Sequence, residues 1–172
     1  MNTIAAIVPE TESPHVLSRC RRLASELGLG LAGPEVADNA PALMVGQRVR
    51  IRFPGEDSRK EELIADWSRL DVRSKAGRDR RQPLVRAVQG RTGYKGLPLV
   101  LDGTAGLGED AWLLSCLGHC VLAVERHPAV FALLRDAWAS AGVLSPWRAR
   151  RIRPVKGDTR SLLEDMIGQA GP

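Results

Sequence analysis

The sequence predicts an α/β protein in which a parallel sheet of about three strands follows a small N-terminal α+β unit. From residue 97 onward, short apolar runs alternate with helix-like stretches, at spacings that fit right-handed crossovers between parallel strands. Strand-like and helical patterns are mixed before residue 71, and an arginine-rich stretch separates the two parts. We therefore expect an N-terminal unit at 1–70, a basic segment at 71–96 and the parallel sheet at 97–172.

The N-terminal unit begins with the strand-like run "TIAAIV". A helix is expected next, because Ser13 can cap it, Pro14 fits its first turn and Gly28 can end it. Two further strands are expected at "APALMV" and "QRVRIRF". Apolar residues alternate with arginines in the second of these, which predicts one apolar face and one basic face.

Composition excludes several classes of protein. Of 172 residues, 44% are hydrophobic and 26% are charged, which is typical of a soluble globular protein. No apolar run approaches the length of a membrane span, and the N-terminus lacks the pattern of a signal peptide, so we expect a cytoplasmic protein. Three cysteines, Cys20, Cys116 and Cys120, form no CxxC motif and no even set, which predicts neither disulfides nor a metal site.

Positive charge is concentrated in two blocks. Nine basic residues stand against two acids between Arg69 and Lys95, and "RARRIRPVK" at 148–156 contains no acid. Arginine suits phosphate oxygens, so the first block is a candidate nucleic-acid surface, with a solvated face as the alternative. Its candidate RNA-binding residues are Arg73, Lys75, Arg78, Arg80 and Arg81. Trp147, beside the second block, is a weaker candidate for base stacking.

A glycine-rich turn at 103–108 joins the first strand of the parallel sheet to its first helix. Strands are expected at 97–102, 120–125 and 152–158, and helices at 109–117, 128–141 and 159–168. Ligands of such sheets bind beyond the carboxyl ends of the strands, where a glycine turn lets backbone N–H groups approach them. The turn is therefore the candidate binding site.

One interpretation of this turn is a dinucleotide site. Gly106, Gly108 and Ala111 satisfy the G-x-G-x-x-A pattern, and Glu125 follows the next strand, where it can hold a ribose. An NAD-type oxidoreductase is therefore one alternative.

Acidic residues around the turn favour a different ligand. Asp102 ends the first strand, and Glu109 and Asp110 begin the helix. Three carboxylates would repel a pyrophosphate and attract a cation. S-adenosylmethionine is such a ligand, since it carries a sulfonium and an ammonium group but no phosphate. Asp158, after the third strand, would then lie beside its adenine.

Two motifs, "LDGTAGLGEDAWLL" and "VERHPAVFALLRD", resemble the RsmJ family of bacterial 16S ribosomal RNA guanine-N2 methyltransferases. That family has a turn like D-x-T-A-G-L-G-x-D and a second strand ending like E-R-x-P. The resemblance implies a Rossmann-like class I methyltransferase core, S-adenosylmethionine as cofactor, and ribosomal RNA or the small ribosomal subunit as partner. By position, the family's cofactor contacts fall on Glu109, Asp110, Glu125, Arg126, Asp158 and Thr159. The predicted cofactor site also includes Asp102, Gly106 and Gly108 of the strand end and the turn.

The chain departs from the family pattern in two places. The segment before the core, "RSKAGRDRRQ", has one glycine, Gly77, where the family is glycine-rich. The chain also stops at "EDMIGQAGP", before the acid-proline motif expected after a fourth strand, so no catalytic residue is predicted. We expect the N-terminal part of such an enzyme, truncated or completed by a second polypeptide or a second copy along the first core strand. A non-catalytic RNA-binding module is the alternative.

Overall fold

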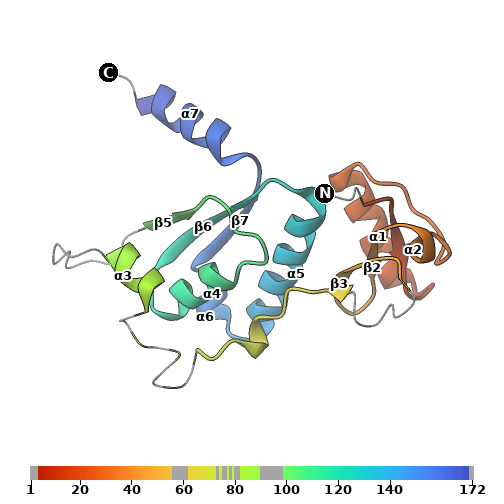
Figure 1. Ribbon diagram of the computed structural model, residues 1–172, viewed down its shortest axis with the longest axis horizontal. Coiled ribbons are helices and arrows are strands. Elements are labelled where there is room, and N and C mark those ends of the chain that lie inside the picture. The colour runs from red at the N-terminus through yellow and green to blue at the C-terminus, as the bar shows by residue number, and fades with distance from the viewer. Residues whose placement is uncertain are drawn as a thin grey trace. The chain divides into compact units, whose positions relative to one another are not determined.

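The computed structural model describes residues 4–55, 62–72, 74, 77, 79, 82–89 and 99–170. It forms two compact units, Met1–Ala65 and Asp66–Pro172 (Figure 1). The division falls before the boundary expected at residue 70, because Trp67 packs within the second unit. Its indole Nε1 donates to the carbonyl of Leu107 at 2.8 Å, and its ring stacks on that of Trp112.

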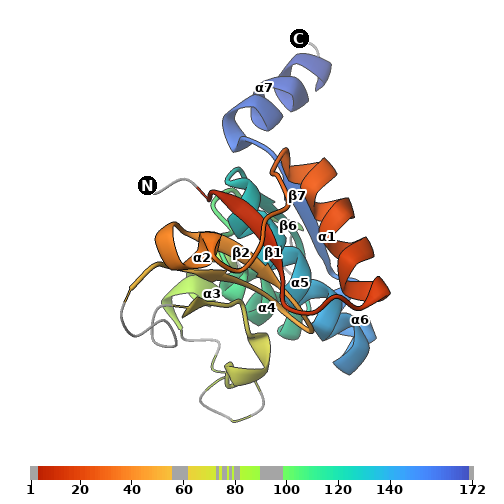
Figure 2. The same cartoon turned by 90° about the vertical axis from the view of Figure 1, so that its right-hand side faces the viewer.

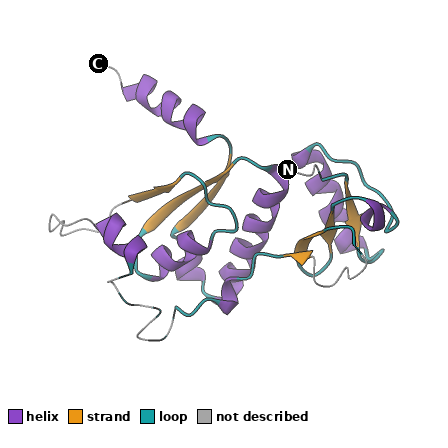
Figure 3. Ribbon diagram, viewed as in Figure 1, coloured by secondary structure: helices purple, strands orange, loops and turns teal. Residues whose placement is uncertain are grey.

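The first unit is built on a four-stranded sheet with the order β1-β2-β3-β4 (Figure 3). Its strands are β1 (Ala6–Pro9), β2 (Ala42–Val45), β3 (Val49–Arg52) and β4 (Glu62–Leu63). β1 and β2 are parallel, and the other two pairs are antiparallel. The expected α+β character of this unit is therefore present.

Two helices cover the β1–β2 pair from either side (Figure 2). α1 (Pro14–Leu27) begins after Ser13, whose side chain accepts a hydrogen bond from the backbone of Val16, and ends at Gly28 in the left-handed conformation. α2 (Val36–Asn39) places Ala37 in a buried cluster with side chains of β1 and β2. The predicted limits of α1 are confirmed, because Ser13 caps its first turn and Gly28 adopts the left-handed conformation that ends it.

The alternating strand β3 has the two faces that the sequence predicts. Val49 and Ile51 are buried, whereas the arginines between and after them are partly exposed. Arg50 forms ion pairs with Glu10 and Glu62, and Arg52 reaches Glu62 at 3.1 Å. Carboxylates therefore neutralise this arginine face.

The second unit contains a parallel sheet with the order β5-β6-β7, which confirms the incomplete Rossmann-like core. Its strands are β5 (Leu99–Asp102), β6 (Cys120–Glu125) and β7 (Ile152–Lys156). α4 (Glu109–Cys116) packs on β6, and α5 (Pro128–Leu144) packs on β6 and β7. α7 (Thr159–Ala170) follows the third strand.

Three helical segments of this unit differ from the expectations. α5 continues three residues beyond the predicted end at Ala141, because Gly142 is tolerated inside a long helix. α6 (Pro146–Ala149) was not predicted, and α3 (Pro83–Gln89) lies within the segment expected to be a basic linker. A short 3-10 helix spans Trp67–Arg69.

β5 lies at one edge of the described sheet and carries exposed leucines. Leu99 is 74% exposed and Leu101 is 37% exposed, and among the described strands β5 pairs with β6 alone. The first core strand is therefore the apolar edge that the sequence predicts.

Candidate cofactor site

The three strands of the parallel sheet end at one edge, where each brings a carboxylate. Asp102 is the last residue of β5, Glu125 is the last of β6, and Asp158 follows β7 by two residues. Because the strands are parallel, these positions lie at the same edge of the sheet. The sheet itself therefore gathers three acids that are far apart in the sequence.

Backbone hydrogen bonds hold the glycine turn against the end of β6. Ala105 N–H donates to the carbonyl of Val124 at 3.0 Å, and Gly106 N–H donates to Glu125 Oε2 at 3.0 Å. Gly106 and Gly108 both have positive φ, at 54° and 79°, so the path of the turn requires glycine at these positions. Both predicted glycines thus shape the site through their backbone.

The carboxylate of Glu125 is oriented by two backbone donors. Besides the bond from Gly106, its Oε1 accepts from His127 N–H at 2.7 Å. A carboxylate has about four acceptor positions, so each oxygen keeps one for a ligand. A pair of vicinal ribose hydroxyls has the matching chemistry, because both are donors.

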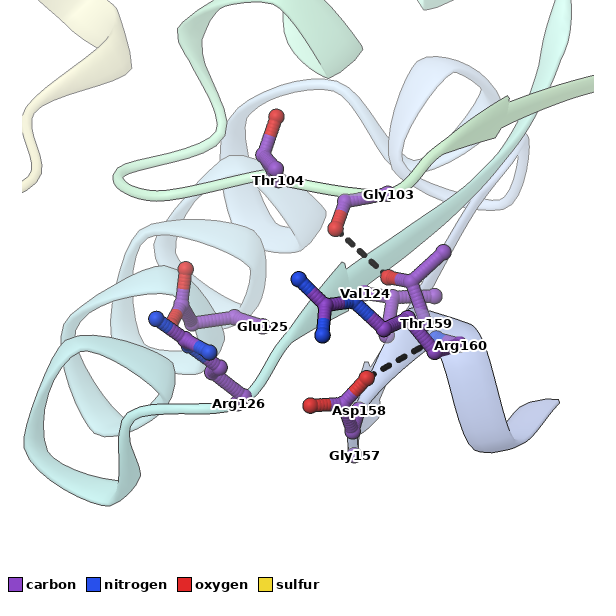
Figure 4. Close-up of a pocket in the computed structure, with 9 residues that line it drawn as sticks. All are labelled: Gly103, Thr104, Val124, Glu125, Arg126, Gly157, Asp158, Thr159 and Arg160. Carbon is purple, nitrogen blue, oxygen red and sulfur yellow. Dashed lines mark hydrogen bonds between the residues drawn. The ribbon is translucent and has the colours of Figure 1, made fainter.

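The segment after β7 is fixed to the glycine turn by one short bond. Thr159 Oγ1 donates to the carbonyl of Gly103 at 2.5 Å, and Asp158 Oδ1 accepts from Arg160 N–H at 2.8 Å (Figure 4). A Cβ at position 103 would lie 2.8 Å from Thr159 Cγ2, so only glycine allows this approach. The two segments together form one wall of a pocket.

This pocket has a volume of about 420 Å³ (Figure 4). It is lined by Gly103, Thr104, Val124, Glu125, Arg126, Gly157, Asp158, Thr159 and Arg160. The structure thus brings together four of the predicted cofactor residues, from the ends of two strands. Sequence reasoning missed the other five lining residues, Gly103, Thr104, Val124, Gly157 and Arg160, although each lies within two positions of a predicted residue.

The other five predicted cofactor residues do not line this pocket. Asp102, Gly106 and Gly108 border neither it nor the second pocket, which holds the remaining two. Glu109 and Asp110, in the first turn of α4, line a second pocket of about 220 Å³. The other residues lining it are Leu70, Asp71, Val72, Gly77, Gln82 and Leu113. The structure does not bring these two acids to the larger pocket. The predicted RNA-binding residues Arg73, Lys75, Arg78, Arg80 and Arg81 lie outside the described residues.

Electrostatics around the turn favour a positively charged ligand. Burial raises the pKa of Asp102. The Thr104 N–H bond offsets part of this rise, and the charges of Asp110 and Glu125 raise the pKa by smaller amounts. Among the described residues, no arginine or lysine forms an ion pair with Asp102. A ligand cation near these carboxylates would be stabilised, whereas a pyrophosphate would be repelled.

The residues present therefore fit S-adenosylmethionine better than a dinucleotide. Glu125 offers free acceptor positions for ribose hydroxyls, and Asp158 can accept from an amino group of a base. The acids of the turn match a sulfonium or an ammonium group. Arg126 and Arg160, both exposed at the pocket, can meet a ligand carboxylate.

In the described part of the chain, no helix is long and apolar enough to cross a membrane.

Comparison with known proteins gives a family. The family model described as "Putative SAM-dependent methyltransferase", in which SAM is S-adenosylmethionine, matches residues 29–170. A ribosomal RNA small subunit methyltransferase J from Aliivibrio fischeri (strain MJ11) is 41% identical over 164 residues, which are 92% of this chain and 61% of the relative. Another, from Shewanella amazonensis, is 42% identical over 97 residues, or 55% of this chain and 38% of the relative.

A solved structure agrees with this assignment. The crystal structure of a SAM-dependent methyltransferase from Neisseria gonorrhoeae superposes with a TM-score of 0.68 and 26% sequence identity, over 95% of this chain and 64% of that one. The chain spans between 38% and 61% of the length of the two curated relatives. On the family match and the shared fold, the chain belongs to the S-adenosylmethionine-dependent methyltransferases, and its predicted kinship with the RsmJ type is confirmed.

Proposed function

We propose that this chain forms the cofactor-binding part of an enzyme that methylates the exocyclic N2 of a guanine in small-subunit ribosomal RNA. The observation that carries the proposal is the pocket at the carboxyl ends of β6 and β7, beside a glycine turn with an acidic surround. Relatives named as ribosomal RNA small subunit methyltransferases support the substrate class. We place this function in the cytoplasm, because bacterial ribosomes are assembled in that compartment.

Each cofactor residue has a proposed role. Glu125 holds the ribose hydroxyls, and Asp158 with Thr159 lies beside the adenine. Asp102 provides negative potential for the cationic end of the cofactor, and Asp110 of α4 adds to it although it lines the second pocket with Glu109. Arg126 meets a carboxylate of the ligand, and the backbone of Gly106 and Gly108 lets the ligand approach closely.

Methyl transfer to guanine N2 needs orientation of the nucleophile. The bound cofactor supplies a methyl group on a sulfonium, which is displaced in line. The N2 lone pair is delocalised into the ring, so this amine reacts only when an acceptor orients it. The acid-proline motif that does so in related enzymes has no match in the 172 residues. We therefore assign no catalytic residue in this chain.

The basic segment is proposed to face RNA. Five basic residues precede the first core strand: Arg73, Lys75, Arg78, Arg80 and Arg81. Basic segments of this kind neutralise RNA phosphates, and the affinity that they provide falls as the salt concentration rises. Replacing the five with alanine is expected to weaken RNA binding and to reduce its salt dependence.

We also propose that β5 pairs with a further strand. Support comes from the exposed Leu99 and Leu101 on its edge position. The added strand comes from a completing polypeptide or from a second copy of the chain. Sedimentation of the wild-type chain and of Leu99→Lys over a range of concentrations separates the two: concentration-dependent dimers that the substitution abolishes favour a second copy.

The cofactor assignment is tested by calorimetric titration of the purified chain. We expect saturable binding of S-adenosylmethionine, and no measurable binding of NAD at the same concentrations. Binding of NAD alone would support the oxidoreductase alternative and overturn the proposal. RNA binding with no binding of either cofactor would support a non-catalytic RNA module.

A further inference from the structure

A corner of the second unit remains outside the proposed site. It consists of residues 143–153, where α5 ends, α6 forms and β7 begins. Three large apolar side chains are exposed here: Val143 is 83% exposed, Leu144 is 75% exposed and Trp147 is 54% exposed. An exposed tryptophan in such surroundings indicates a binding surface more than a solvent-facing side chain.

The same corner is strongly basic. Arg148, Arg150, Arg151 and Arg153 lie in six residues, and no acid occurs in the sequence between Asp136 and Asp158. Arg150 and Arg153 are exposed, and neither forms an ion pair with a described carboxylate. This arginine group therefore differs from that of β3, which Glu10 and Glu62 neutralise.

α6 is held firmly, so Trp147 is presented by a rigid support. Trp138 Nε1, on α5, donates to the carbonyl of Ala149 at 3.0 Å, and the Ala149 side chain is buried. Arg151 donates to the carbonyl of Gly118 at 2.5 Å. The guanidinium carbon of Arg148 lies 4.7 Å from the centre of the Trp147 ring, which forms a cation–π pair.

We propose that this corner is a second RNA-binding surface. Trp147, with Arg148 over its ring, provides a stacking platform for an unpaired base, and Arg150 and Arg153 bind phosphates. Val143 and Leu144 extend the apolar part of the platform. The inference rests on the proposed function, since it takes the same RNA as the partner.

The position of the corner defines which part of the RNA it binds. The strand β7 runs from the corner to the cofactor pocket, and its five residues span about 16 Å. Figure 1 shows α6 and α7 at opposite ends of this strand. The corner therefore contacts RNA that flanks the methylated nucleotide and does not hold the target base.

Fluorescence anisotropy with a labelled single-stranded RNA of about 20 nucleotides tests the proposal, at several salt concentrations. For Arg150→Ala with Arg153→Ala, we expect affinity to fall about tenfold or more and the salt slope to decrease by about 1.4, since each phosphate contact to a single strand contributes about 0.7. The matched control is Arg21→Ala with Arg22→Ala, which removes the same charge from exposed positions of α1 and should change affinity by about threefold or less.

Substitution of Trp147 tests stacking separately. Trp147→Ala should weaken RNA binding about fivefold or more, whereas Trp147→Phe should retain most of the affinity. All variants should bind S-adenosylmethionine like the wild type. If wild-type chain binds cofactor and RNA but the corner variants match the control, this inference fails and the proposed function stands.

Other results also overturn the inference. If the wild-type chain does not bind RNA, the inference is refuted. If the wild-type chain binds neither RNA nor S-adenosylmethionine, the proposed function is refuted too. If Trp147→Ala leaves RNA affinity unchanged and abolishes concentration-dependent self-association, the corner joins copies of the chain.

Discussion

Gly108, which precedes α4, is a position where a single added methyl group should have a large measurable effect on stability. Its φ of 79° strains any other residue by about 1–2 kcal/mol. A Cβ there would also meet Leu134 Cδ1 and would lie 2.6 Å from Trp67 Cζ2. The leucine methyl can move, but the indole of Trp67 is held by the Leu107 carbonyl and by stacking on Trp112.

We therefore expect Gly108→Ala to lower the free energy of unfolding of the second unit by about 2–5 kcal/mol. Overpacking contributes about 1–3 kcal/mol of this and backbone strain the remainder. Gly106→Ala is the matched control, because its φ is also positive, at 54°, while the nearest atom to its Cβ is 3.9 Å away. The difference between the two variants isolates the packing contribution.

Tryptophan fluorescence during urea unfolding is a suitable assay. All four tryptophans, Trp67, Trp112, Trp138 and Trp147, lie in the second unit, so the signal reports that unit alone. The midpoint for Gly108→Ala should be lower than for Gly106→Ala, with the same slope. Equal destabilisation of the two variants would refute the packing argument and leave backbone strain as the sole cause.

The remaining predictions concern the cofactor edge. Asp102→Asn should weaken S-adenosylmethionine binding about tenfold (~1.4 kcal/mol) in calorimetry, and the exposed Asp38→Asn should not; equal effects would contradict the role of Asp102. The pKa of Asp102 in the folded state lies above its usual 3.8, so its contribution to stability is fully present below pH 3.8 and is lost as pH rises through the folded pKa. Near pH 7 the ionised Asp102 is therefore destabilising. Asp102→Asn should then unfold at a higher urea concentration than wild type. Wild-type cofactor affinity should fall as acidification protonates this residue. Thr159→Val removes the bond to Gly103 and should destabilise the second unit by about 1 kcal/mol while weakening cofactor binding; unchanged urea midpoints would show that the bond contributes nothing.

The parts of the fold that could be predicted are those with local signals. Ser13, Pro14 and Gly28 determine the ends of α1, and alternation determines the faces of β3. α6 could not be predicted, because four residues between a long helix and a strand carry no periodicity. The position of Trp67 was also beyond prediction, since it depends on the distant Leu107 and Trp112.

The chain order of a parallel sheet determines where four of the predicted site residues lie, and their role in cofactor binding stays a prediction. Glu125, Arg126, Asp158 and Thr159 follow strand ends, and they line one pocket. Glu109 and Asp110 are in the same turn as Gly106, but the helix beginning at Glu109 directs them to a different pocket. Sequence distance alone does not reveal this separation, because each residue of a helix is rotated by about 100° from the one before it.

The acidic edge of the sheet explains both why a ligand is needed and which ligand is excluded. Asp102 lies partly buried within reach of the charges of Asp110 and Glu125, so the ionised site is unfavourable by itself. The N-terminus of α4 offsets part of this cost for Asp110, because that residue lies in the first helical turn. A cationic ligand removes the remainder, and its binding therefore stabilises the folded unit as well as filling the pocket. A phosphate-containing cofactor would add to the repulsion around Asp102, so we expect these carboxylates to favour S-adenosylmethionine over NAD at a turn whose glycines fit either.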